Sequence, residues 1–211
     1  MTVRDVIRNT VLGGALLAGF AIAGVALVTL TWQKTAPQIA ENERHVLVNM
    51  LNEVLPAEMH DNDLLDDAIS VQGSELLGTA APVTIYRAYN NGVPVAALFT
   101  SVAPDGYSGD IRLLVGIRAD GRLTGVRVLA HKETPGLGDY IERERSDWIT
   151  HFDNTSLRNP SPEDWDVKRY GGTFDQFTGA TITPRAVVRA VRNTLLYFRE
   201  HRDDIFAKTE S

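Results

Sequence analysis

In the stretch VTIYRAYNNGVPVAALFT, residues 83–100, two apolar runs flank the dipeptide Asn91-Gly92. Strand-forming residues on either side of Asn-Gly predict a β-hairpin, because a tight two-residue turn requires positive φ angles that Asn and Gly tolerate. Residues 111–118 and 123–130 repeat this arrangement around Asp120-Gly121. The two hairpins together predict an antiparallel sheet.

Helical patterns lie outside this sheet in the sequence. Residues 35–55 carry apolar side chains at helical spacing until Pro56 ends the pattern, and the same spacing recurs from Arg185 to Phe198. A shorter helix is expected at 140–149. Consecutive strands with helices at the ends predict an α+β fold, and the lack of strand–helix alternation argues against a Rossmann domain.

The N-terminal region contains an uncharged apolar run, VLGGALLAGFAIAGVALVTLTW, at residues 11–32. As a helix it would be about 33 Å long, which matches the hydrocarbon core of a bilayer. The run is longer than the apolar core of a signal peptide, and no cleavage site follows Trp32. We therefore expect a transmembrane anchor. Basic residues on its two sides nearly balance, with a slight preference for a cytoplasmic N-terminus.

The composition excludes several classes of function. The 211 residues carry 27 acidic and 21 basic side chains, a net charge of −6, so no basic surface for nucleic acid is expected. Cysteine is absent, which excludes disulfides, iron–sulfur clusters and thiolate zinc sites. The acidic residues at 57–67 lack the pattern of a calcium loop, and His131 with Glu133 is too small a set for a metal site. We expect no metal.

The run DQFTGATITP, residues 175–184, precedes the C-terminal helix. Pro184 suits the first helical position, and Thr183 suits the N-cap. A helix start offers an anion unpaired backbone N–H groups and the positive end of the helix dipole. Three threonine hydroxyls add to this, and Gly179-Ala180 leaves room for a bulky group. These features predict a phosphate held at a helix entrance, and the alternative is an ordinary junction between a loop and a helix cap.

A second run, HKETPGLG at residues 131–138, follows the last expected strand. Thr-Pro-Gly-x-Gly forms a tight, rigid turn whose backbone can contact a flat ring. On the residues alone, a plain turn is the alternative.

The first run resembles the flavinylation motif of the FMN-binding domain family. Thr178-Gly179-Ala180-Thr181 is followed by Ile182-Thr183 and preceded by Asp175. The likeness is closest to the G subunit of the Rnf ion-translocating electron-transport complexes. It implies that the hydroxyl of Thr181 carries FMN through a phosphoester bond. In this family a flavin transferase makes the bond from FAD with Mg²⁺, so the chain would be the substrate of that enzyme.

The second run resembles the same family over its whole length, and Gly106-Tyr107-Ser108-Gly109 also fits the family pattern. The resemblance implies that the second run lies on the isoalloxazine side of the flavin site. The residues that it assigns to the cofactor are Thr181, Thr178, Gly179, Ala180, Thr183, Asp175, Glu133, Thr134, Gly136, Leu137 and Gly138.

The resemblance implies a covalently flavinylated, membrane-anchored electron carrier in a complex that couples NADH–ferredoxin electron transfer to Na⁺ or H⁺ movement. Other membrane and peripheral subunits would be its partners, and its main domain would lie in the periplasm on a single-pass inner-membrane anchor. The expected parts are a cytoplasmic stub and transmembrane helix (1–34), a linker helix and polar connector (35–80), an FMN-binding domain (81–200) and a C-terminal tail (201–211). Two alternatives stay open: the equivalent subunit of a Na⁺-translocating NADH:quinone reductase, and a non-redox periplasmic binding or assembly module.

Overall fold

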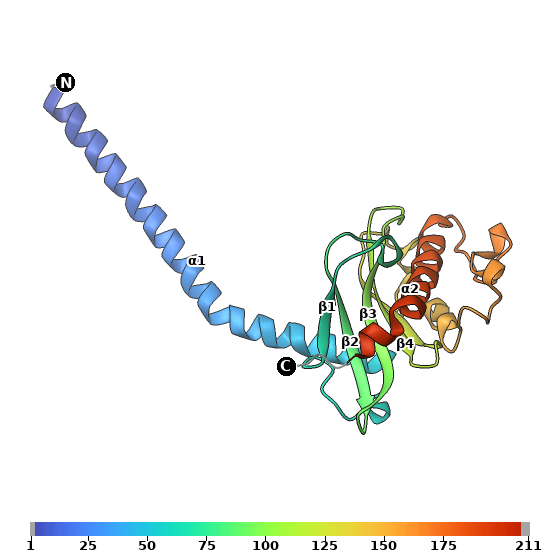
Figure 1. Cartoon of the computed structure of the whole chain (residues 1–211). Helices are drawn as coiled ribbons and strands as arrows, with labels where there is room; N and C mark the ends of the chain where they lie inside the picture. The colour runs from blue at the N-terminus through green and yellow to red at the C-terminus, as the bar shows by residue number, and fades with distance from the viewer. Residues whose placement is uncertain (1–2, 208–211) are drawn as a thin grey trace. The chain divides into compact units, whose positions relative to one another are not determined.

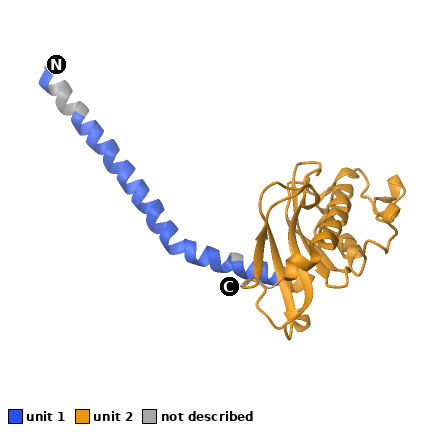
Figure 2. Cartoon of the chain, viewed as in Figure 1, with its two compact units in different colours: residues 1–49 blue, residues 50–211 orange. Residues whose placement is uncertain are grey.

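The computed structural model describes residues 3–207 of the chain. Two compact units divide between Asn49 and Met50 (Figure 2). The first unit contains most of helix α1 (Val3–Val54). The last residues of this helix, from Met50 onward, belong to the second unit. The second unit holds the sheet and the C-terminal helix. The domain limits expected from the sequence stay predictions.

Helix α1 is continuous where the sequence predicts two segments, 11–32 and 35–55. Pro37 lies inside it and removes only one backbone hydrogen bond, so the helix continues on both sides. The apolar side chains at 11–32 are exposed. Among residues 3–207, α1 is the one helix that is long and apolar enough to cross a membrane, in agreement with the expected anchor.

Five strands form one antiparallel sheet whose spatial order follows the sequence. They are β1 (Ala68–Val71), β2 (Val83–Asn90), β3 (Val93–Ala103), β4 (Ile111–Arg118) and β5 (Leu123–Ala130). The expected α+β fold and both hairpins are confirmed. The sequence does not predict β1, because four residues at the sheet edge that pair with β2 alone carry too short a pattern.

Helix α2 (Ile182–Phe206) covers one face of the sheet and lies against β3 and β4 (Figure 1). Phe99 of β3 meets Tyr197 and Phe198 of α2 edge to face, with ring centroids 6.2 and 6.1 Å apart. The helix continues past residue 201, where a surface tail is expected, because Ile205 is buried in the same core. Residues 208–211 of the expected tail lie outside the described residues.

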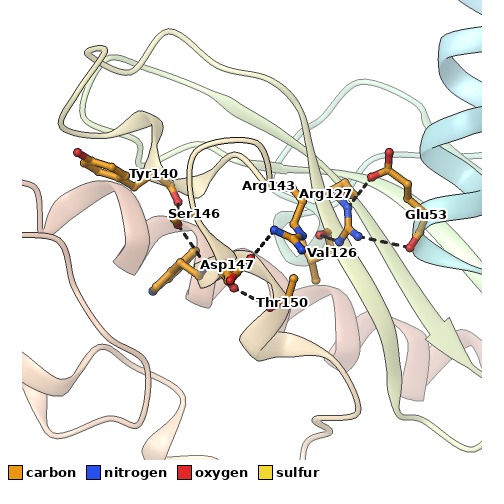
Figure 3. Close-up of polar contacts among 9 residues, drawn as sticks. Glu53, Val126, Arg127, Tyr140, Arg143, Ser146, Asp147 and Thr150 are labelled. Atoms are coloured by element: carbon orange, nitrogen blue, oxygen red, sulfur yellow. Dashed lines mark hydrogen bonds and ion pairs between the residues drawn. The ribbon is translucent and has the colours of Figure 1, made fainter.

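The end of α1 packs on the other face of the sheet, where Leu51 and Val54 are buried. A Cβ atom on Gly116 would lie 2.4 Å from Val54 Cγ1, so β4 needs a glycine where the helix end crosses it. Arg127 of β5 holds the same helix end (Figure 3), because its Nε donates to Glu53 Oε2 at 2.9 Å and its Nη2 to Glu53 O at 3.5 Å. The sheet is therefore covered on both faces.

The segment between β5 and α2 contains short 3₁₀ turns joined by loops, so the helix predicted at 140–149 is wrong. Residues 142–146 separate the turns η3 (Asp139–Ile141) and η4 (Asp147–Phe152). The last of them, Ser146, is the N-cap of η4, and its hydroxyl donates to Tyr140 O at 2.6 Å (Figure 3). Such local side-chain bonds compete with the backbone bonds of a helix. Stacked and edge-to-face aromatic rings hold the segment together: Trp148, Phe152, Trp165, Phe174 and Phe177.

Candidate functional site

Three separate segments meet at the N-terminal end of α2. They are the loop 106–109 before β4, the turn 131–138 after β5 and the residues 179–183. They line a cavity of about 230 Å³. Its lining residues are Tyr107, Glu133, Thr134, Leu137, Gly138, Gly179, Ala180, Thr181, Ile182 and Thr183. The two runs that the sequence singles out therefore form one site.

The carboxylate of Glu133 joins these segments. Its side chain is buried, Oε1 accepts from the backbone N–H of Ser108 at 2.9 Å, and Oε2 accepts from the hydroxyl of Thr183. Hydrogen bonds to a carboxylate are stronger than those between neutral groups. Glu133 thus fixes the loop 106–109 and the start of α2 relative to its own turn.

His131 orients the same turn. Its Nδ1 accepts from the backbone N–H of Glu133 at 3.0 Å, so the proton of the neutral ring lies on Nε2. Nε2 then donates to Glu142 Oε1 at 2.9 Å. Because both ring nitrogens are engaged, His131 acts as a support for the turn.

Two glycines of the turn 131–138 are required for different reasons. A Cβ atom on Gly138 would lie 2.8 Å from Glu133 Cβ and 3.2 Å from Thr183 Oγ1, so no side chain fits there. Gly136 has open space around it but a φ of +78°, which L-residues with a Cβ rarely adopt. Gly179 of the other run has a φ of +82°, and a Cβ atom there would lie 3.8 Å from Leu137 Cδ2.

Substitutions separate these two reasons. Gly138→Ala is expected to lower the free energy of unfolding by about 1–3 kcal/mol through overpacking, and Gly136→Ala by about 1–2 kcal/mol through backbone strain. Asparagine tolerates positive φ, so Gly136→Asn should recover most of the loss, whereas Gly138→Asn should be worse than Gly138→Ala. Denaturant unfolding of the detergent-solubilised chain, followed by tryptophan fluorescence, measures this. Equal behaviour of Asn at both positions would contradict it.

Thr181, not Thr183, is the N-cap residue of α2. The sequence places the start of the helix two residues late, because Pro184 is compatible with any position of the first turn, where N–H groups lack helical acceptors. Thr183 is instead buried and bonded to Glu133. The hydroxyl of Thr181 makes no cap bond and accepts from Arg169 Nη1 at 3.4 Å.

Most of the residues expected at the cofactor line the cavity, and three do not. Gly136 shapes the turn, and its N–H donates to Asp139 Oδ1 at 2.7 Å. Thr178 is exposed just before the lining residues. Asp175 pairs with Lys168 Nζ at 2.7 Å, and its carbonyl accepts from Trp148 Nε1 at 2.8 Å. The bond from Trp148 holds the run 175–184 against the aromatic rings of the segment between β5 and α2.

Sequence reasoning left three residues out of the site. Tyr107 and Ile182 line the cavity, and Arg169 contacts Thr181. Tyr107 belongs to a run that fits the family pattern, so the sequence did carry a signal for it. Nothing in the sequence marks Arg169, because a 3₁₀ turn at Lys168–Tyr170 brings it to Thr181.

A bidentate ion pair between Arg185 and Asp166 holds the start of α2 against the segment that precedes it. Arg185 Nε and Nη2 donate to Asp166 at 2.9 and 2.8 Å, and the guanidinium lies 3.8 Å from the Tyr170 ring centroid. Burial raises the pKa of Asp166, but the hydrogen bonds from Arg185 and from the Val167 N–H outweigh it and lower that pKa below its usual value.

This ion pair makes stability depend on acidity. A carboxyl group whose pKa is lower in the folded chain contributes stability above its unfolded pKa, and the contribution is lost as the pH falls through the folded pKa. We expect the unfolding free energy to fall below about pH 4, and less steeply in Asp166→Asn than in the parent chain. Denaturant unfolding at a series of pH values measures the two slopes. Asp110→Asn, an exposed control, should keep the parent slope, and an unchanged slope in Asp166→Asn would refute the effect.

The residues of the cavity fit a flavin mononucleotide. Leu137, Ile182 and Tyr107 are 45, 52 and 70% exposed, and a flat ring in the cavity would cover such side chains. The Thr181 hydroxyl and the Arg169 guanidinium supply polar partners for a phosphate. The cavity is smaller than the roughly 300–1,000 Å³ of pockets that enclose drug-sized ligands, so part of the group would lie outside it.

Two protein families match the sequence. The FMN-binding domain matches residues 106–196, a range that contains all three segments of the site. The RnfG N-terminal region matches residues 1–54, which correspond to α1 and the two residues before it.

Curated relatives resemble the chain over nearly its whole length. The G subunit of the ion-translocating oxidoreductase complex of Pseudomonas aeruginosa is 50% identical over 205 residues, which cover 97% of this chain and 96% of the relative. The protein of the same name from Shewanella piezotolerans is 43% identical over 204 residues, with 97% and 96% covered. That of Vibrio cholerae is 46% identical over 192 residues, with 91% of each covered.

Proposed function

Because this chain belongs to the RnfG family, the G subunits of ion-translocating oxidoreductase complexes, we propose that it is a membrane-anchored electron carrier with FMN attached covalently to Thr181. One observation carries the proposal: the Thr181 hydroxyl lies at the cavity that both sequence motifs line, beside the guanidinium of Arg169. The flavin supplies the redox chemistry, and the chain supplies attachment, position and electrostatic surroundings.

In the attachment step Thr181 is the acceptor of a group transfer. Its Oγ1 bonds to the flavin-side phosphorus of FAD, the bond from that phosphorus to the bridging oxygen breaks, and AMP leaves with that oxygen. The hydroxyl proton passes to a base of the flavin transferase, which acts with Mg²⁺. Arg169 Nη1 lies 3.4 Å from Thr181 Oγ1, so its guanidinium would pair with the phosphate charge of the ester.

A covalent bond suits this site better than reversible capture. The positive end of a helix dipole stabilises an exposed phosphate by only about 0.3–1 kcal/mol. The cavity of about 230 Å³ encloses only part of the cofactor. An ester bond through the phosphate holds the flavin regardless of these small terms and leaves its ring chemically unaltered.

The chain acts within a complex. The names of the relatives favour other subunits of an ion-translocating oxidoreductase as its partners. The sequence carries no nicotinamide-binding fingerprint, so electrons arrive from and leave to neighbouring subunits. We place α1 across the inner membrane with its N-terminus in the cytoplasm and the FMN-binding domain in the periplasm, as the charge bias and the family resemblance suggest.

Fluorescence of the denatured chain tests the proposal. The chain is produced with and without the flavin transferase, separated under denaturing conditions and viewed under ultraviolet light. A flavin band is expected only with the transferase, because denaturation removes any cofactor that is not covalently bound. A dark band in both samples would favour the alternative of a non-redox binding or assembly module.

A further inference from the structure

A groove far from the flavin site gathers positive charge. It has a volume of about 640 Å³ and lies between the β4–β5 turn, the loop 154–159 and the C-terminal half of α2. Arg122, Arg158, Arg199 and Arg202 line it, and Asp120 is the one acidic residue of the lining within residues 3–207. Such a concentration of arginine stands out on a chain whose net charge is −6.

Two of these arginines have no side-chain partner among the residues that the structure describes. The guanidinium groups of Arg122 and Arg158 make no hydrogen bond or ion pair with any residue that the structure describes, and both residues are exposed. Asp120 is already paired with Arg118 at 3.7 Å. The groove therefore has spare donors, arranged to receive carboxylates.

The other two arginines have contacts that shape the groove. Arg202 Nε donates to the carbonyl of Ala119 at 2.9 Å, which ties α2 to the β4–β5 turn. Arg199 pairs with the neighbouring Glu200 at 3.6 Å, an exposed contact worth little. Apolar side chains also line the groove: Leu157 is half-buried, and Phe198 is only 2% exposed, so Leu157 supplies most of the accessible apolar surface. An apolar floor with arginines around it is typical of the centre of a protein interface.

We infer that this groove docks an acidic segment of another protein of the complex, one that presents at least two carboxylates beside an apolar side chain. The segment's carboxylates pair with Arg122 and Arg158, and its apolar side chain contacts the floor. The distance along α2 from Thr183 to Arg199 is about 24 Å at 1.5 Å per residue, so the groove and the flavin site are separate places on the surface. The inference rests on membership of a complex and not on the covalent flavin.

Photo-crosslinking in the assembled complex tests the inference. A benzophenone side chain replaces exposed Asn159 of the groove, native membranes are irradiated, and the crosslinked peptide is identified by mass spectrometry. We expect a peptide from another protein of the complex, with Asp or Glu on both sides of an apolar residue. A peptide without acidic residues, a phospholipid adduct or the lack of any adduct would overturn the inference.

Charge reversal supplies the matched comparison. Arg122→Glu with Arg158→Glu should lower the crosslink yield by about tenfold or more, because like charges then face each other. Arg112→Glu, an exposed arginine of β4 outside the groove, should leave the yield unchanged. An equal yield in both variants would contradict the inference. The flavin fluorescence of every variant should match the parent, so failure here is distinguishable from failure of the proposed function.

Discussion

Replacing Thr181 with valine is expected to abolish the fluorescent flavin band of the denatured chain. Valine has nearly the shape of threonine but no hydroxyl, so the ester has no acceptor atom while the cavity keeps its form. Thr181 makes no cap bond to α2, so the helix loses little by the change. The measurement is band intensity relative to protein stain after production with the transferase.

Two controls define the acceptor. Thr181→Ser keeps a hydroxyl and should keep the band. Thr178→Val removes the exposed hydroxyl three residues earlier and should also keep it, because Thr178 does not line the cavity. If Thr178→Val removed the band and Thr181→Val retained it, the acceptor would be Thr178.

Glu133→Ala is expected to lower the unfolding free energy by about 2 kcal/mol and to weaken flavinylation. The substitution leaves the N–H of Ser108 and the hydroxyl of Thr183 without their common acceptor, and three segments of the site lose their link. The denaturant midpoint of the detergent-solubilised chain and the band intensity measure the two effects.

A graded series tests the reason for this loss. Glu133→Gln can still accept from Ser108 and turn its amide toward the Thr183 oxygen, which accepts as well as donates, so it should lose less than alanine. Glu163→Ala, at an exposed position of the 3₁₀ turn η5 (Pro162–Asp164), should change neither quantity. Identical losses for Gln and Ala at position 133 would argue that charge, not the hydrogen-bonded link, is what matters there.

The strands and the long helices follow from short-range patterns. Both hairpins are predictable because Asn91-Gly92 and Asp120-Gly121 fix the turns, and the strands β4 and β5 then have the expected bounds. Periodicity likewise finds α2. These elements depend on residues close together in the sequence.

The features that the sequence did not predict depend on contacts between distant segments. Thr183 has the chemistry of an N-cap, but burial and Glu133, fifty residues away, give it another role. Ser146 and the aromatic cluster replace the expected helix at 140–149 by 3₁₀ turns. Arg169 reaches Thr181 only through the turn that carries it. The motifs thus located the cavity, while the bonds that build it required the structure.

The mass of the intact chain, purified from native membranes, shows whether FMN is bound covalently to it. We expect the polypeptide mass plus one FMN less one water, with the added mass on the peptide that contains Thr181. The mass of the bare polypeptide, in a preparation whose complex transfers electrons, would contradict it.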